Sequence, residues 1–231
     1  MRNLSIALFS CGLALLSVSP LAMAQSRQTF TVKKAIPEQS ADTRVEDLDE
    51  MSFVEMINSV PLDDKSAALI RKFQEKEGRN RLLNREFGPK SKCTVETYRN
   101  KEVLLLSIPA SSLFAPNDTV LRKDAASLLA PLKRYMKNDD MYRVLLVMHT
   151  DNTGSEEYRD MLTEERSRAV ADWFADHGAD TTYLFPYAFG DDMPLKENNS
   201  IENRAANRRL EVYLMPGKKM LEQAKKGRIV F

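Results

Sequence analysis

The residues best suited to chemistry are an acid and a base on either side of one predicted turn. Asp151 closely follows the apolar run 143–148, and Arg166 lies about three turns into a helix that Ser155 is suited to cap. This spacing places opposite charges beside one cleft. A carboxylate accepts hydrogen bonds from an ammonium group, and a planar guanidinium binds a carboxylate through two parallel bonds. The pair therefore suits a zwitterion.

Sequence patterns typical of catalysis or metal binding are missing. The two histidines, His149 and His177, are far apart and lack cysteines or carboxylates at ligand spacing. No Gly-x-Ser-x-Gly motif occurs, and the 8 glycines include no phosphate-binding loop. The sequence therefore predicts a binding protein that is not an enzyme and has no cofactor or metal.

The elements that must position these charges follow from the hydrophobic pattern. Leu121, Leu128 and Leu132 share one face of a predicted helix over 121–136, which Pro131 should kink or shorten. A second helix runs from Ser155 to about 177, and a short helical turn covers 201–206. Strands are predicted at 93–98, 103–108, 143–148, 183–189 and 208–215. This order predicts an α/β (α+β) two-layer sandwich.

The N-terminal residues 1–24 are predicted to be an export signal. Arg2 precedes an apolar stretch, and Ala22-Met23-Ala24 is typical of a cleavage site before Gln25. An uncleaved anchor and a lipoprotein acylated at Cys11 are the alternatives. The formal charge of +1 falls to zero when Arg2 leaves with the signal, so no nucleic-acid partner is expected.

Beyond the signal, four segments are expected. Residues 25–61 are polar and predict a tether, and 62–92 predict an amphipathic helical segment with a weak point at Gly78. The sandwich occupies 93–215, and a basic tail covers 216–231. The sandwich therefore carries a helical or partly disordered N-terminal extension. Cys93, the one cysteine outside the signal, predicts a fold without an internal disulfide.

Two motifs inside 93–215 resemble a known family. The first consists of Thr150-Asp151, Gly154, Tyr158, Leu162-Thr163 and Arg166. The second consists of Gly190, Pro194, Asn198-Asn199-Ser200 and Arg204-Ala205-Ala206-Asn207-Arg208-Arg209. Their order and separation resemble the OmpA-like peptidoglycan-binding domain of OmpA C-termini, peptidoglycan-associated lipoprotein and flagellar MotB.

The resemblance implies a ligand and a set of contacts. It implies that Asp151 and Arg166 bind the diaminopimelate of a peptidoglycan stem peptide, whose free amino-acid end carries both charges on one carbon. Arg208 and Asn117 fall where the family has secondary contacts or pocket walls. Thr150 and Asn152 are expected to line the pocket. The implied function is to anchor an envelope component to the cell wall from the periplasm, in association with the outer membrane.

Four residues depart from the family pattern, and none removes the charge pair: Met148, Arg159, Ser167 and Asn203. Asn203 replaces a glycine, and asparagine tolerates left-handed backbone angles better than other non-glycine residues. Arg159 replaces an asparagine and adds positive charge near the cleft. It could therefore alter the affinity or the preferred stem amino acid.

Structural and functional alternatives stay open. Taken singly, Asp151 is a common turn residue and Arg166 a common ion-pair partner. The chain could also be an envelope scaffold that acts through its N-terminal region on an outer-membrane protein partner. A stator-like motor component would need a retained acidic transmembrane helix, and residues 1–24 contain no acid. The sequence does not set the oligomeric state.

Overall fold

The computed structural model describes residues 51–59, 63–88, 91–137 and 139–231. The predicted export signal and residues 25–50 of the predicted tether lie outside these ranges. Within them, no helix is both long enough and apolar enough to cross a membrane.

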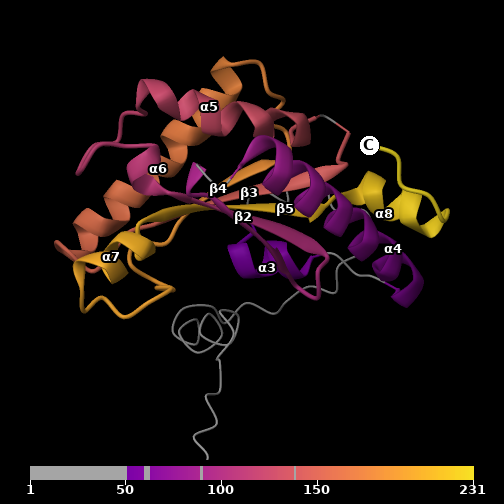
Figure 1. Ribbon diagram of the computed structural model, residues 1–231, viewed down its shortest axis with the longest axis horizontal. Helices are drawn as coiled ribbons and strands as arrows, with labels where there is room; N and C mark the ends of the chain where they lie inside the picture. The colour runs from indigo at the N-terminus through magenta and orange to yellow at the C-terminus, as the bar shows by residue number, and fades with distance from the viewer. Residues whose placement is uncertain (1–50, 60–62, 89–90, 138) are drawn as a thin grey trace, which may run out of the picture. The chain divides into compact units, whose positions relative to one another are not determined.

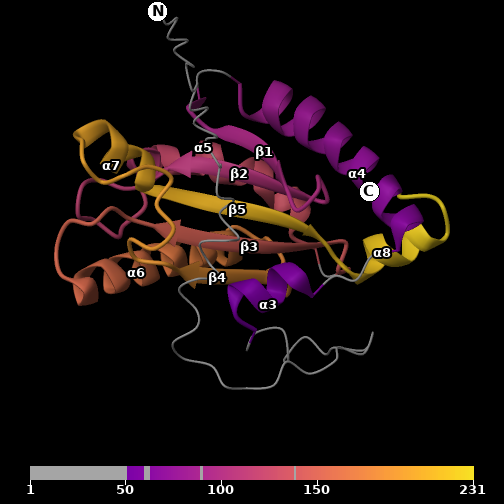
Figure 2. The same cartoon turned by 90° about the horizontal axis from the view of Figure 1, so that it is seen from below.

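Five strands form one mixed sheet in the order β1-β2-β5-β3-β4 (Figure 2). Their bounds are β1 Thr94–Tyr98, β2 Val103–Pro109, β3 Tyr142–His149, β4 Leu184–Ala188 and β5 Arg209–Pro216. β3 and β4 are parallel, whereas the other neighbours are antiparallel. All eight residues of β3 are buried, as its apolar sequence predicted for a strand covered on both faces. The five predicted strands and the predicted fold class are confirmed.

One face of the sheet is covered by a layer of helices (Figure 1). Leu104 of β2, Val144 of β3 and Leu210 of β5 belong to the core that the sheet and this layer share. The helices and turns here are α4 Asp64–Glu75, η2 Lys76–Glu86, η5 Lys123–Ala125, α5 Ala126–Leu129, η6 Ala130–Tyr135 and α6 Glu156–Asp176. Pro131 opens the 3-10 helix η6, which accounts for the predicted interruption.

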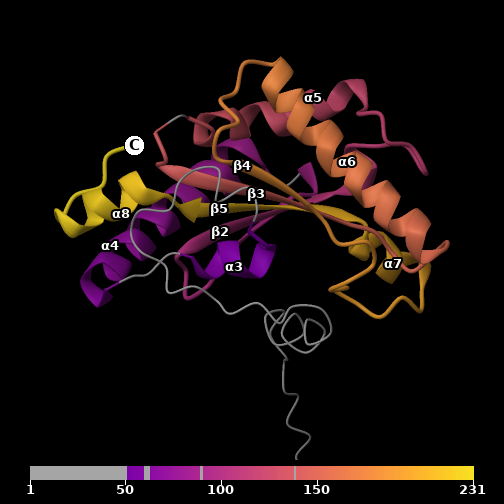
Figure 3. The same cartoon turned by 180° about the vertical axis from the view of Figure 1, so that it is seen from behind.

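The opposite face carries α3, Phe53–Asn58, which the sequence did not predict. Phe53, Met56 and Ile57 are buried, and the Phe53 ring packs edge-on against Tyr213 at 5.1 Å between centroids. Ser52 and Glu55 form a capping box that starts the helix. The predicted tether over 25–61 must therefore be corrected for 51–59, because three buried apolar residues at helical spacing attach this stretch to the sheet. Figure 3 shows α3 on this side of the sheet.

The helical segment around Gly78 is present as two consecutive helices. The α-helix α4 changes to the π-helix η2 at Lys76, close to the predicted weak point. Gly78 lies so close to Leu104 of β2 that a Cβ atom would overlap the leucine side chain. A glycine at this position therefore lets the helix approach the sheet.

The C-terminal residues also differ from the predicted basic tail. They form α8, Lys218–Lys225, which lies beside α4 (Figure 1). The ring of Phe231 stacks on Tyr135 at 5.6 Å and meets Tyr142 edge-on at 5.1 Å. The apolar residues Met220 and Ala224 are buried, so this segment is part of the core despite its lysines.

Candidate binding site

The site lies where β3 ends and β5 begins. His149 pairs with Arg209 across these antiparallel neighbours, so the residue after one strand lies near the residue before the other. Thr150 and Asp151 follow β3, and Arg208 precedes β5. The helix α7, Ile201–Asn207, leads into Arg208, and η4, Ala110–Ser112, leads away from β2 toward the loop that holds Asn117.

Asp151 is a buried carboxylate held in a fixed orientation. Its Oδ1 accepts a 2.9 Å hydrogen bond from the Thr153 amide and another from the Thr153 hydroxyl, while Oδ2 pairs with the Arg208 guanidinium. Burial alone would raise the pKa of Asp151, but these hydrogen bonds outweigh it and the pKa lies below its usual value. The carboxylate is therefore ionised at neutral pH.

Arg166 and Arg208 differ in their exposure to solvent. Arg166 is 4% exposed. Its Nε donates to the Asp118 carbonyl at 2.8 Å and one terminal nitrogen to the Ala115 carbonyl at 3.2 Å. The guanidinium also lies 4.9 Å over the Phe114 ring. The side chain of Arg208 is 39% exposed. Burial, together with the nearby positive charge of Arg208, lowers the pKa of Arg166.

Asp151 and Arg166 were predicted to contact one ligand together, and in the structure they do not contact each other directly. The carboxylate of Asp151 contacts Arg208 instead, and Arg166 donates to the loop that precedes α5. The cause is the strand pairing, which sets Arg208 next to Asp151, whereas Arg166 projects from α6 onto that loop. The amide of Ala110, in the turn that leads to this loop, donates to the Arg208 carbonyl at 3.0 Å, and the positive charge of Arg208 contributes to lowering the pKa of Arg166. The three charges therefore gather at one end of the sheet.

The weaker predicted contacts are placed around this group. Asn117 is exposed in the loop that holds Arg166 and has a φ of 57°, which asparagine tolerates. Thr150 is buried, and its amide donates to the Gly190 carbonyl at 2.7 Å. Asn152 is exposed on the turn after Asp151.

Sequence reasoning missed Thr153 as a partner of Asp151. An Asp whose carboxylate accepts from the amide two residues later forms an Asx turn, and the Asp-Asn-Thr sequence is compatible with this turn. Arg159 was predicted to add positive charge near the cleft, and its ion-pair partner was not predicted. In the structure its Nε donates to Asp191 at 2.8 Å, so much of that charge is neutralised. No local pattern connects these two residues.

A second polar group lies beneath the site and is closed to solvent. Glu211 accepts from Arg209 Nε and from the Tyr213 hydroxyl, both at 2.7 Å, and its Oε2 lies 3.3 Å from His149 Nε2. Burial opposes ionisation of Glu211, but these partners lower its pKa to about 2. Burial lowers the pKa of His149. The group fixes the start of β5 through buried hydrogen bonds.

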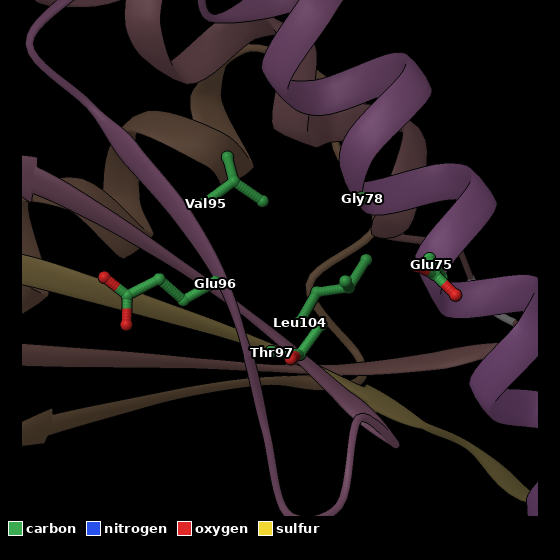
Figure 4. A pocket seen from close by; sticks show the side chains of 6 residues that line it. All are labelled: Glu75, Gly78, Val95, Glu96, Thr97 and Leu104. Carbon is green, nitrogen blue, oxygen red and sulfur yellow. The ribbon is translucent and has the colours of Figure 1, made fainter.

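A hollow of about 330 Å³ lies elsewhere, between the helical segment and β1 (Figure 4). Val95, Leu104 and Gly78 form its apolar part, and Glu75, Glu96 and Thr97 its polar part. None of the predicted site residues lines it. It is therefore separate from the charges at the end of β3.

Residues 113–208 match the model of the OmpA family and include all the predicted site residues. The outer-membrane lipoprotein YfiB of Pseudomonas aeruginosa is 31% identical over 100 residues, which cover 43% of this chain and 60% of YfiB. The peptidoglycan-binding protein ArfA of Mycobacterium tuberculosis is 36% identical over 70 residues, which cover 30% of this chain and 22% of ArfA. Each match spans less than two thirds of the relative.

A solved structure supports the fold. A MotB-like protein from Desulfovibrio vulgaris superposes with a TM-score of 0.56 at 25% sequence identity, covering 65% of this chain and 95% of that chain. The shared part therefore extends beyond the residues that match the family model.

Proposed function

Because residues 113–208 form an OmpA-family domain, we propose that this chain binds peptidoglycan non-covalently and anchors an envelope component to the cell wall. ArfA, named as a peptidoglycan-binding protein, supports this proposal through the stretch it shares with the chain. The proposal involves no catalytic step.

The ligand that we propose is the free amino-acid end of diaminopimelate in a stem peptide. Asp151 is buried and ionised, which suits an ammonium group. The half-exposed guanidinium of Arg208 is placed to bind the carboxylate, and the positive charge of Arg166 adds to the attraction. A zwitterion would join the existing Asp151–Arg208 pair, so neither charge would be left buried and unpaired. This pair carries the proposal.

The expected affinity for one stem peptide is modest. A small polar ligand buries little surface and its charges must be desolvated, so Kd is expected at about 1 µM to 1 mM. Firm attachment would come from many copies on one polymer.

Cosedimentation with purified peptidoglycan tests the proposed function. Asp151→Asn removes the charge without changing the side chain's shape and is expected to abolish sedimentation, as is Arg208→Ala. Arg168→Ala is the matched control, because its exposed ion pair with Glu164 lies on the same helix α6. Circular dichroism checks folding. Undiminished sedimentation of both site variants would contradict the assignment.

We also propose that the chain acts in the periplasm in association with the outer membrane. YfiB, named as an outer-membrane lipoprotein, supports this location, as does the predicted export signal. Within 51–88, α3 and α4 bury apolar residues against the sheet, so these buried residues are not available to the outer-membrane partner of the scaffold alternative.

A further inference from the structure

Two loops beside Asp151 are joined by one side chain. Arg159, on α6, donates from Nε to Asp191 Oδ1 at 2.8 Å and from one terminal nitrogen to the Gly154 carbonyl at 2.7 Å. Gly154 belongs to the turn that contains Asp151, and Asp191 to the loop that follows β4. The forked guanidinium therefore connects the two loops.

The loop after β4 forms part of the surroundings of Asp151. The Gly190 carbonyl accepts from the amide of Thr150, the residue before Asp151, at 2.7 Å, and the Gly190 amide donates to Thr163 Oγ1 at 3.1 Å. Gly190 has a φ of 48° and leaves no room for a Cβ atom against Asp160. The loop after β4 is therefore hydrogen-bonded directly to the backbone next to the Asp151 carboxylate.

We propose that the Arg159–Asp191 ion pair is a latch that positions Asp151 for its ligand. The latch rests on the proposed function and makes Arg159 a positioning residue. The side chains of Arg159 and Asp191 are 16% and 32% exposed, so the pair is partly shielded from water and better defined than an ion pair on an open surface. The guanidinium of Arg159 pairs with Asp191. In this proposal it therefore does not bind the ligand as a third cation beside Arg208 and Arg166.

The binding test compares the affinities of variants for a soluble stem tripeptide that ends in diaminopimelate. Arg159→Ala and Asp191→Ala should each weaken binding about tenfold, as expected when a group that orients a binding residue is lost. The double variant should be no weaker than either single variant, because both remove the same latch. Arg159→Lys keeps the charge without the fork and should restore part of the affinity.

The sign of the Asp191 effect separates positioning from direct contact. If Arg159 bound the ligand itself, Asp191→Ala would free its charge and strengthen binding, which would overturn the latch. Unchanged affinity in both single variants would overturn it equally. Arg168→Ala, which breaks the exposed Arg168–Glu164 pair on α6, should leave the affinity unchanged.

Amide hydrogen exchange tests the latch without any ligand. In the full chain, Arg159→Ala and Asp191→Ala should each speed exchange of the Thr150 and Gly190 amides at least severalfold, whereas Arg168→Ala should not. Exchange at wild-type rates would overturn the latch. If the wild-type chain failed to bind the tripeptide while these amides behaved as expected, the ligand assignment would fail and the latch would stand.

Discussion

Arg208 and Arg209 are neighbours in sequence, yet each forms a carboxylate pair of a different kind. Arg208 pairs with Asp151 and is 39% exposed at the side chain, whereas Arg209 pairs with Glu211 and is 4% exposed. All three nitrogens of Arg209 donate, to Glu211, to the Asn207 carbonyl and to the Met193 carbonyl. Successive residues entering a strand point to opposite faces. Arg208 thus belongs to the ligand site that we propose, and Arg209 to the buried structure beneath it.

Replacing Arg209 should have the largest effect on stability. Arg209→Ala leaves Glu211 buried beside an uncharged histidine, and loss of one partner of a buried pair costs about 3 to 5 kcal/mol. Urea denaturation of the full chain measures the free energy of unfolding. If Arg209→Ala lowered the free energy of unfolding by less than about 1 kcal/mol, Arg209 would not have the structural role that distinguishes it from Arg208.

Acid should destabilise the folded chain through two buried groups, His149 and Glu211. The pKa values of His149 and Glu211 are both depressed in the folded chain, so the folded state binds fewer protons than the unfolded state. Their contribution is complete above about pH 6.5 and is lost as the pH falls, with Glu211 losing its part between 4.5 and about 2. Urea denaturation at a series of pH values should show the free energy of unfolding decreasing as the pH falls. Glu211→Gln should flatten the low-pH part of this decrease, and an unchanged profile would contradict the role of Glu211.

Replacing Arg208 should affect stability least. Asp151 keeps its two hydrogen bonds from Thr153, and removal of the half-exposed Arg208 side chain opens the other carboxylate oxygen to water. Arg208→Ala should therefore cost about 1 kcal/mol or less. The same variant should lose peptidoglycan binding. A cost equal to that of Arg209→Ala would remove the distinction between the two arginines.

The sequence predicted helices and strands better than it predicted which side chains contact one another. Strong local patterns identified all five strands, and Ser155 caps α6 by accepting from the Tyr158 amide as expected. The six residues of α3 are too few to show a sustained helical period, and packing against the sheet supplies their stability. The C-terminal α8 has few apolar residues among its lysines, and its burial depends on α4.

In the candidate site, too, local patterns identified residues but not their contacts. Asp151 and Arg166 could be selected by residue type and spacing, and Arg208 through the resemblance to the family pattern. Their pairing depends on β3 and β5 being neighbours, which no local pattern specifies. The Arg159–Asp191 contact likewise joins elements that are distant in the chain. Thr153 was the one missed partner with a local signature, the Asx turn.

The most direct test is a comparison of two soluble stem tripeptides that differ only in their last residue, diaminopimelate or lysine. Lysine keeps the side-chain ammonium group and lacks the adjoining carboxylate. Isothermal titration should show the diaminopimelate peptide binding at least about tenfold more tightly, since one charge-assisted pair is lost with lysine. Arg208→Ala should remove that preference. Equal affinity of the wild-type chain for the two peptides would contradict a zwitterion held by Asp151 and Arg208.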